Sequence, residues 1–208
     1  MTKLPDLNSL KVDVGEFVSR QLLRENDLRR RLLKSVDYFA GDLRELETLH
    51  SVVAGKLEPV FIEWGWLGIN FFDWEAAGAL SKLVSLCWSQ PTFMRRCLPI
   101  IEQAARSGEA PGSSFALHYD TVMSLENKKQ VYGAFFDWDA DGQLSAAEII
   151  EPQLVDFRRA VFGLESFVKA TETARAEARA CGLTGPRDLI RFRKTRADWL
   201  TQAGWQRR

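Results

Sequence analysis

The sequence predicts a mainly α-helical protein, a single helical domain with one β-hairpin near residues 130–150. Most of the chain places apolar residues three and four positions apart, which is the spacing of helices buried on one face. One stretch differs, because two short runs rich in aromatic and branched residues are separated by the turn pair Asp141-Gly142. A chain of 208 residues is long enough for one well-buried core and short for two.

Charge and cysteine content limit the partners and the compartment. The 28 basic and 28 acidic residues balance, so no net field attracts nucleic acid or a membrane surface, and we expect neither as a partner. The three cysteines show no C-x-x-C spacing, which argues against a disulfide framework or a structural zinc site. No apolar run approaches a leader segment or a membrane span, so we expect a cytoplasmic protein.

Three parts of the chain are expected. Residues 1–9 are predicted to form a flexible tail, and residues 10–182 the helical domain with its hairpin. Residues 183–208 are predicted to form a basic C-terminal helix that packs on the domain or extends from it. Its seven basic residues against two acidic ones after position 186 are typical of a solvated helix face.

The helices follow from apolar spacing and from capping residues. An amphipathic helix is expected from about residue 10 to residue 33, and a second over 43–64, although Gly55 and Pro59 argue against its continuity. The glycine- and aromatic-rich segment 65–72 is expected to be a packed loop, after which Asp73 caps the next helix. Further helices are expected over about residues 74–88, from Pro91 to 107, from Ser113 or Ser114 to 127, over 153–180 and over 186–203.

The expected hairpin joins a strand over 130–136 to a second over 143–150. The same region contains the string D-W-D-A-D-G-Q-L-S-A-A-E, a complete match to the twelve-residue calcium loop of the EF-hand. In that interpretation the ligands are Asp137, Asp139, Asp141, Gln143 (through its carbonyl), Ser145 (through water) and Glu148.

The context of the string favours the hairpin over the calcium loop. An EF-hand needs a helix on each side, but Gly133 and a β-favouring run precede the loop and Pro152 follows it. No second loop of this kind exists to pair with it. Calcium is therefore a possible cofactor, no other is expected, and we predict weak or absent binding.

Short motifs recur in a defined order over about residues 56–168. They are Gly65-Trp66, Glu75, Arg96-Cys97-Leu98, Gly108-Glu109, Tyr132-Gly133, Ile150-Glu151-Pro152, Val155-Asp156-Phe157-Arg158-Arg159 and Gly163-Leu164. In this order the chain resembles an uncharacterised, mainly bacterial domain family with G-W, R-C-L, Y-G-T-Q, I-E-D-P and V-D-x-R-R signatures.

The chain departs from that family at two places. The family carries a histidine late in the helix after its glutamate, where this chain has the segment 85–88, Ser-Leu-Cys-Trp. The Thr-Gln of Y-G-T-Q is replaced by Ala134-Phe135. The family usually lacks a full acidic loop near residues 131–150, which again favours a hairpin. The resemblance therefore implies a degenerate member without the family's histidine.

Two groups of residues are candidates for a site. Glu75, His118, Asp120 and Tyr132 are candidates for general acid–base catalysis in a cleft. The alternative, which we favour, is a structural hydrogen-bond network. Trp66, Phe71, Trp74 and Arg159 are candidates for ligand binding, the aromatic residues lining a pocket or interface and Arg159 holding an anion. The alternatives that we favour are structural, with the aromatic residues in the core and the arginine in an ion pair with Glu151 or Asp156.

Three functions remain open on the sequence alone. The leading hypothesis is a binding or interaction module, since the histidine and the polar pair after Tyr132 are missing. Its partner, a small molecule or a protein, is not specified by the sequence. The alternatives are a cofactor-independent enzyme acting on a small molecule and a calcium-binding protein.

Overall fold

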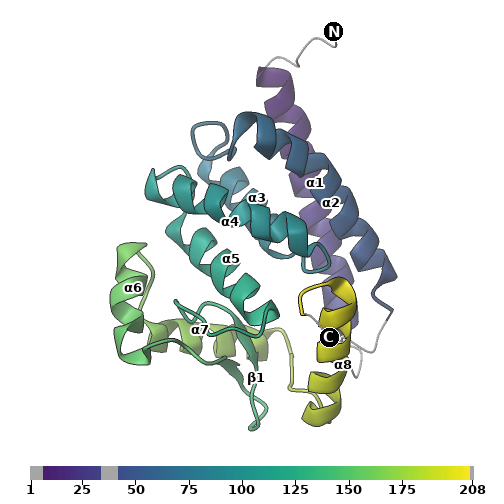
Figure 1. Cartoon of the computed structure of the whole chain (residues 1–208), viewed down its shortest axis with the longest axis vertical. Coiled ribbons are helices and arrows are strands. Elements are labelled where there is room, and N and C mark those ends of the chain that lie inside the picture. The colour runs from purple at the N-terminus through teal and green to yellow at the C-terminus, as the bar shows by residue number, and fades with distance from the viewer. Residues whose placement is uncertain (1–6, 34–41, 207–208) are drawn as a thin grey trace.

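The computed structural model describes residues 7–33 and 42–206, and it confirms a mainly helical fold with one β-hairpin (Figure 1). The described elements are α1 (Leu7–Leu33), α2 (Arg44–Trp64), α3 (Trp74–Ser85), α4 (Pro91–Arg106), α5 (Gly112–Leu125), β1 (Phe136–Trp138), β2 (Leu144–Ala146), the 3-10 turn η1 (Pro152–Leu154), α6 (Val155–Val161), α7 (Phe167–Ala180) and α8 (Leu189–Ala203).

The first five helices form the main core. Helix α3 packs against α1 and α5, α4 packs against α5, and α1 packs against α2. The faces that meet are lined by fully buried side chains such as Leu57, Leu80 and Ile101. The apolar stripes in the sequence are therefore the helix faces that meet in this core.

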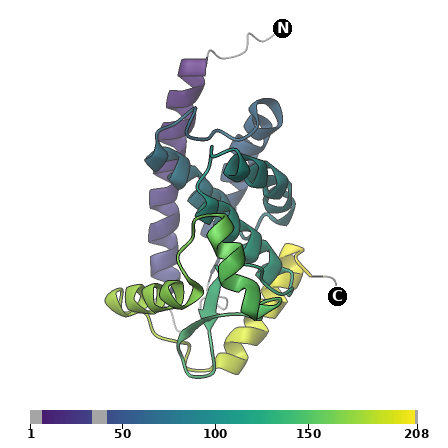
Figure 2. The ribbon, with the colours of Figure 1, turned by 90° about the vertical axis from the view of Figure 1, so that its left-hand side faces the viewer.

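The part of the chain that follows α5 lies at one end of that core (Figure 2). β1 and β2 pair antiparallel, and α7 packs against β2. Helix α8 lies beside the hairpin in both views, and its buried Phe192 and Leu200 join the core. Two indole N–H groups near its end tie it down, from Trp199 to the Glu47 carboxylate (2.9 Å) and from Trp205 to the Trp88 carbonyl (2.6 Å).

Helix α2 is continuous through Gly55 and Pro59, the two residues expected to interrupt it. Pro59 lies inside the helix, and the carbonyl that it deprives of a partner is that of Gly55, four residues earlier. Both residues are exposed. Water can therefore solvate that carbonyl, and glycine leaves its peptide free to tilt.

The predicted 153–180 helix is divided into η1, α6 and α7. Gly163 adopts a left-handed φ of 65° and ends α6, and Ser166 then caps α7 by accepting the Lys169 amide at 3.3 Å. Helix α5 begins at Gly112 and not at a serine cap. A Cβ at Gly112 would lie 2.3 Å from the Phe162 carbonyl oxygen, so this close approach requires glycine.

The remaining differences concern ends. Residues 7–9, placed in the predicted tail, belong to α1, and residues 1–6 lie outside the described residues. Each strand is three residues long, shorter than expected. No helix within the described ranges is long and apolar enough to cross a membrane.

Candidate functional site

Asp120 holds the loop that leads into the hairpin. Its carboxylate is fully buried and accepts the amides of Val131 (2.8 Å), Tyr132 (3.0 Å) and Ala134 (2.8 Å). Burial raises the pKa of Asp120 above its usual value, although these three amides and the Arg159 charge act in the opposite direction. The predicted catalytic carboxylate is thus fully engaged with the backbone.

Two arginines of α6 hold the carbonyl groups of the same loop. Arg158 donates to the Val131 carbonyl at 2.8 Å. Arg159, which is buried, donates to the carbonyls of Tyr132 and Glu165, both at 2.7 Å. The Gly133 carbonyl is a third acceptor at 3.5 Å. The guanidinium of Arg159, a candidate for ligand binding, thus donates to the protein's own backbone.

Gln130 closes the loop from inside. Its fully buried side-chain amide donates to the Phe135 carbonyl (2.8 Å) and accepts the Phe135 amide (3.0 Å), in the manner of a neighbouring strand. The predicted first strand is replaced over 130–135 by this loop, in which Gly133 has a φ of 60°. We call Asp120, Gln130, Arg158 and Arg159 the loop clamp.

The four acid–base candidates do not meet in one pocket. His118 is fully buried, with Nε2 2.9 Å from the Met94 carbonyl and Nδ1 3.1 Å from Ser85 Oγ. Burial lowers its pKa to about 4. Glu75 is exposed in the first turn of α3, whereas His118 and Asp120 are fully buried on α5. Asp120 contacts Tyr132 through the Tyr132 backbone amide and not through its hydroxyl.

Tyr132 belongs to an aromatic cluster. Its ring lies 5.8 Å from Phe115, 5.9 Å from Tyr119 and 5.7 Å from Phe162, centroid to centroid. Burial, and then the charge of Asp120, raise the pKa of its hydroxyl. Such edge-to-face contacts are typical of packing.

The aromatic ligand-binding candidates are split between core and surface. Trp66 is buried and lies 5.0 Å from the Phe61 ring, while Phe71 is half-buried against Phe72. Trp74, at the start of α3, is 60% exposed. Residues 65–72 form a packed loop, as predicted. Trp74, which follows this loop at the start of α3, is the exposed member of the aromatic candidates.

The acidic string forms the tip of the hairpin. The Asp139 amide donates to the Gln143 carbonyl (2.9 Å), and the Gly142 amide to the Asp139 carbonyl (3.2 Å). Gly142 has a φ of 70°. This is a three-residue hairpin loop that ends in a left-handed glycine, and it accounts for the Asp-Gly pair without a metal.

Three of the four carboxylates of the string, those of Asp137, Asp139 and Glu148, face the protein's own donors. Asp137 forms an ion pair with Arg196 of α8, and Glu148 with Lys129 at 2.5 Å. Asp139 accepts the Ser145 hydroxyl at 2.6 Å and the Asp141 and Gln143 amides. Across residues 7–33 and 42–206, no three His, Cys, Asp or Glu side chains are grouped as a metal site requires. This arrangement does not fit calcium.

Calcium titration tests this interpretation. We expect calorimetry with CaCl₂ to give no saturable heat in the micromolar range, because binding would have to break the Arg196 and Lys129 ion pairs and the Asp139 turn bonds. The Glu148→Gln variant, which removes the ligand at position 12, should behave like the parent. Micromolar binding that this variant loses would show that the loop rearranges into a calcium site.

A cleft lies between the hairpin and α8. Its volume is about 710 Å³, within the usual range of ligand sites, about 300–1,000 Å³. Phe135, Trp138 and Leu200 supply apolar walls. The charged lining residues are Lys128, Lys129, Asp137, Asp139, Glu148, Arg193 and Arg196.

Most charges of the cleft are paired, and one cation is left over. Asp137 and Glu148 have the partners given above, Asp139 lies 3.9 Å from Arg175, and Lys128 pairs with Glu126 at 2.7 Å. Arg193 is exposed and has no ion pair within the described part of the chain. The cleft therefore presents an unneutralised guanidinium beside aromatic walls.

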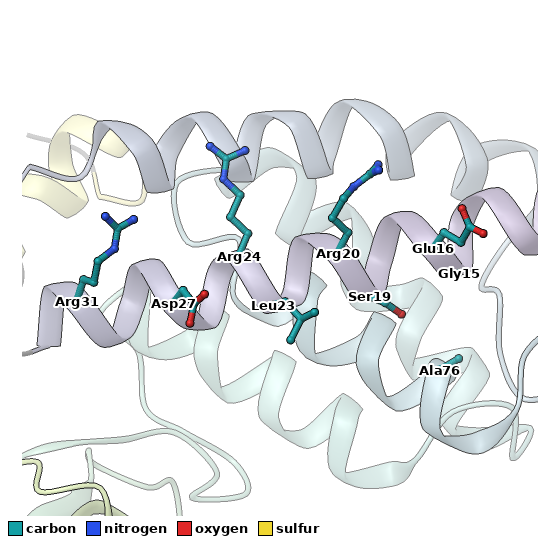
Figure 3. A pocket seen from close by; sticks show the side chains of 9 residues that line it. All are labelled: Gly15, Glu16, Ser19, Arg20, Leu23, Arg24, Asp27, Arg31 and Ala76. Carbon is teal, nitrogen blue, oxygen red and sulfur yellow. The ribbon is translucent and has the colours of Figure 1, made fainter.

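A larger hollow, of about 860 Å³, runs along α1 but is less suited to a ligand (Figure 3). All its lining residues except Ala76 come from this one helix. Figure 3 shows Arg20 and Arg24 pointing to one side of α1 and Leu23 to the other. A surface built on one helix does not enclose a small molecule.

Two arginines of the cleft lie in a part of the sequence whose charge pattern predicts a solvated helix face. Arg193 and Arg196 belong to the C-terminal basic run, which was predicted to be a solvated face. Gln130 gave no signal, since a polar residue in a strand-like run is ordinary. Comparisons with protein-family models, with curated proteins and with solved structures found no match for the chain.

Proposed function

We propose that this protein is a cytoplasmic binding module whose ligand site is the cleft between the hairpin and α8. The ligand is a small molecule that carries an anionic group on a flat apolar body. The observation that carries the proposal is that Arg193, which has no ion pair among the described residues, lines the same cleft as Phe135 and Trp138. Guanidinium groups bind oxyanions and aromatic walls bind flat apolar groups. The resemblance to a mainly bacterial domain family suggests a bacterial source for such a module.

The rest of the site supports binding over acid–base catalysis. Asp120 and Arg159 are occupied by hydrogen bonds to the backbone within the loop clamp. His118 is fully buried and has no access to solvent. The clamp also fixes the base of the hairpin, and with it one wall of the cleft. A preformed wall reduces the conformational entropy lost on binding.

The experiment compares two fluorescent probes that share their rings. 8-Anilinonaphthalene-1-sulfonate is anionic, and N-phenyl-1-naphthylamine is its neutral analogue. We expect saturable binding of the sulfonate, weakened about tenfold by Arg193→Gln, which is the size of one lost charge-assisted hydrogen bond. The neutral analogue should bind both proteins equally.

Lys194→Gln is the matched control, since Lys194 is the next residue of α8 and does not line the cleft. It should leave the affinity for both probes unchanged. Equal losses from Arg193→Gln and Lys194→Gln would show only a general charge effect. No loss from Arg193→Gln would place the sulfonate elsewhere and end the proposal.

A further inference from the structure

His50 lies in a buried polar cluster that is built from three separate parts of the chain. Its Nδ1 atom is 2.9 Å from Oγ of Ser89, in the turn between α3 and α4. Its Nε2 atom is 3.5 Å from Oε2 of Glu25, on α1. Glu25 and His50 are buried, while Ser89 is half-buried and so reaches the surface. A hydroxyl, an imidazole and a carboxylate thus form one chain of contacts.

The charges in this cluster suit proton transfer from Ser89. Burial alone would raise the pKa of Glu25, but His50 and Arg29 outweigh it and lower that pKa. Arg29 donates to Oε1 from Nε (2.9 Å) and Nη2 (2.6 Å). Burial lowers the pKa of His50. At neutral pH the carboxylate is therefore ionised and the imidazole is a free base.

The hydrogen bonds also select the tautomer. The Ser89 amide points to Nδ1 at 3.4 Å, so Nδ1 is the acceptor and Nε2 carries the hydrogen toward Glu25. Within the described residues, neither Nε2 nor Glu25 Oε2 has a hydrogen-bond partner. Their 3.5 Å separation is slightly too long for a hydrogen bond, as is common in catalytic groups without substrate.

The other histidine provides an internal comparison. His118 Nδ1 lies 3.1 Å from Ser85 Oγ, but the Ser85 hydroxyl also faces the Ser81 carbonyl at 2.9 Å. Nε2 of His118 faces a backbone carbonyl and not a carboxylate, and both residues are fully enclosed. The His50 pair differs in its carboxylate, in its exposure and in a serine hydroxyl whose partner, among residues 7–33 and 42–206, is the imidazole alone.

Ser89 also lies just before the positive end of α4. Pro91 is the first residue of that helix, and the side chain of Gln90 does not cap it. The amides of Thr92 and Phe93 therefore lack partners within the helix. Such amides stabilise the negative charge that develops on a carbonyl or phosphoryl oxygen.

We infer that Ser89 is a nucleophile, with His50 as its general base and Glu25 as the residue that positions His50. The substrate class is carboxylic esters. Ser89 Oγ attacks the ester carbonyl and its proton passes to His50 Nδ1. The bond to the alkoxy group then breaks, and the alcohol leaves with that proton. Water releases the acid by the reverse proton path. The inference is independent of the cleft beside α8.

Diisopropyl fluorophosphate tests the nucleophile directly. Ser89 Oγ forms a bond to phosphorus, fluoride leaves, and His50 takes the proton. We expect one diisopropylphosphoryl group per chain by intact mass, located at Ser89 by fragmentation. Ser89→Ala should remove it, and His50→Gln should slow labelling about 100-fold or more. Ser85→Ala, the matched control at the other serine–histidine pair, should label like the parent.

Glu25 requires a measurement that a structural role would not change. The labelling rate should rise with pH as His50 loses its proton. Glu25→Gln removes the charge that favours imidazolium, so it should move the midpoint to lower pH. Circular dichroism establishes that each variant is folded. If His50→Gln does not fold, the pH profile of the parent still decides. An unlabelled parent, an adduct elsewhere or a flat profile would overturn the inference.

Discussion

Asp120→Ala should lower the free energy of unfolding by about 3–5 kcal/mol, because three buried amides lose their acceptor together. Urea denaturation followed by circular dichroism measures the change. A single unsatisfied amide costs less, so the size of the effect reports on the clamp as a unit. Asp120→Asn should fall between the parent and Asp120→Ala, since it keeps one oxygen but presents an N–H₂ group to amide donors.

Asp198→Ala on α8 is the control for this comparison. Asp198 is exposed, so its replacement should change the unfolding free energy by less than about 0.5 kcal/mol. Similar midpoints for the Asp120→Ala and Asp198→Ala variants would mean that the loop clamp does not stabilise the fold.

Acidification should destabilise the protein through His118. Its pKa is about 4 in the folded state and near 6.5 when unfolded. Between these values the unfolded chain binds more protons, so stability falls as pH decreases from about 6.5 toward 4. The single group should remove about 2 kcal/mol between pH 7 and pH 4.5. Burial lowers the pKa of His50 as well, so it acts in the same direction.

The variant His118→Gln isolates that contribution. Glutamine does not titrate, so the variant should be less stable than the parent at pH 7 but should lose less on acidification. Urea denaturation at pH 7 and pH 4.5 gives the four free energies that are needed. Equal losses in both proteins would place the acid sensitivity in other groups.

The sequence was sufficient for the helices and for the position of the hairpin, since these depend on local spacing and on Asp141-Gly142. It placed α2 correctly but left the continuity of that helix in doubt, because Pro59 and Gly55 compensate each other at a distance of four residues. It did not predict the division of the 153–180 helix into η1, α6 and α7. It favoured a structural network around Asp120 but could not give the partners in the loop clamp, because Asp120 binds backbone amides and every residue type except proline has a backbone N–H. Side-chain identity at positions 131–134 therefore holds no record of these bonds.

The candidate site shows a second limit of sequence reasoning. A calcium loop is recognised from twelve consecutive residues, but the neutralising charges come from elsewhere. Arg196 of α8 faces Asp137 and Arg175 of α7 lies near Asp139. The meaning of a local acidic string thus depends on distant cations, which only the folded chain brings together. The same holds for Glu25, His50 and Ser89, which no short motif unites.

The loop clamp makes a segment without regular secondary structure rigid. Residues 131–134 belong to no helix or strand, yet the amides of Val131, Tyr132 and Ala134 end on a buried carboxylate. Their hydrogens can exchange with water only when α5 releases Asp120. We therefore expect this irregular segment to open together with the core, on the time scale of global unfolding, and to protect its amides for longer than the hairpin tip beyond it.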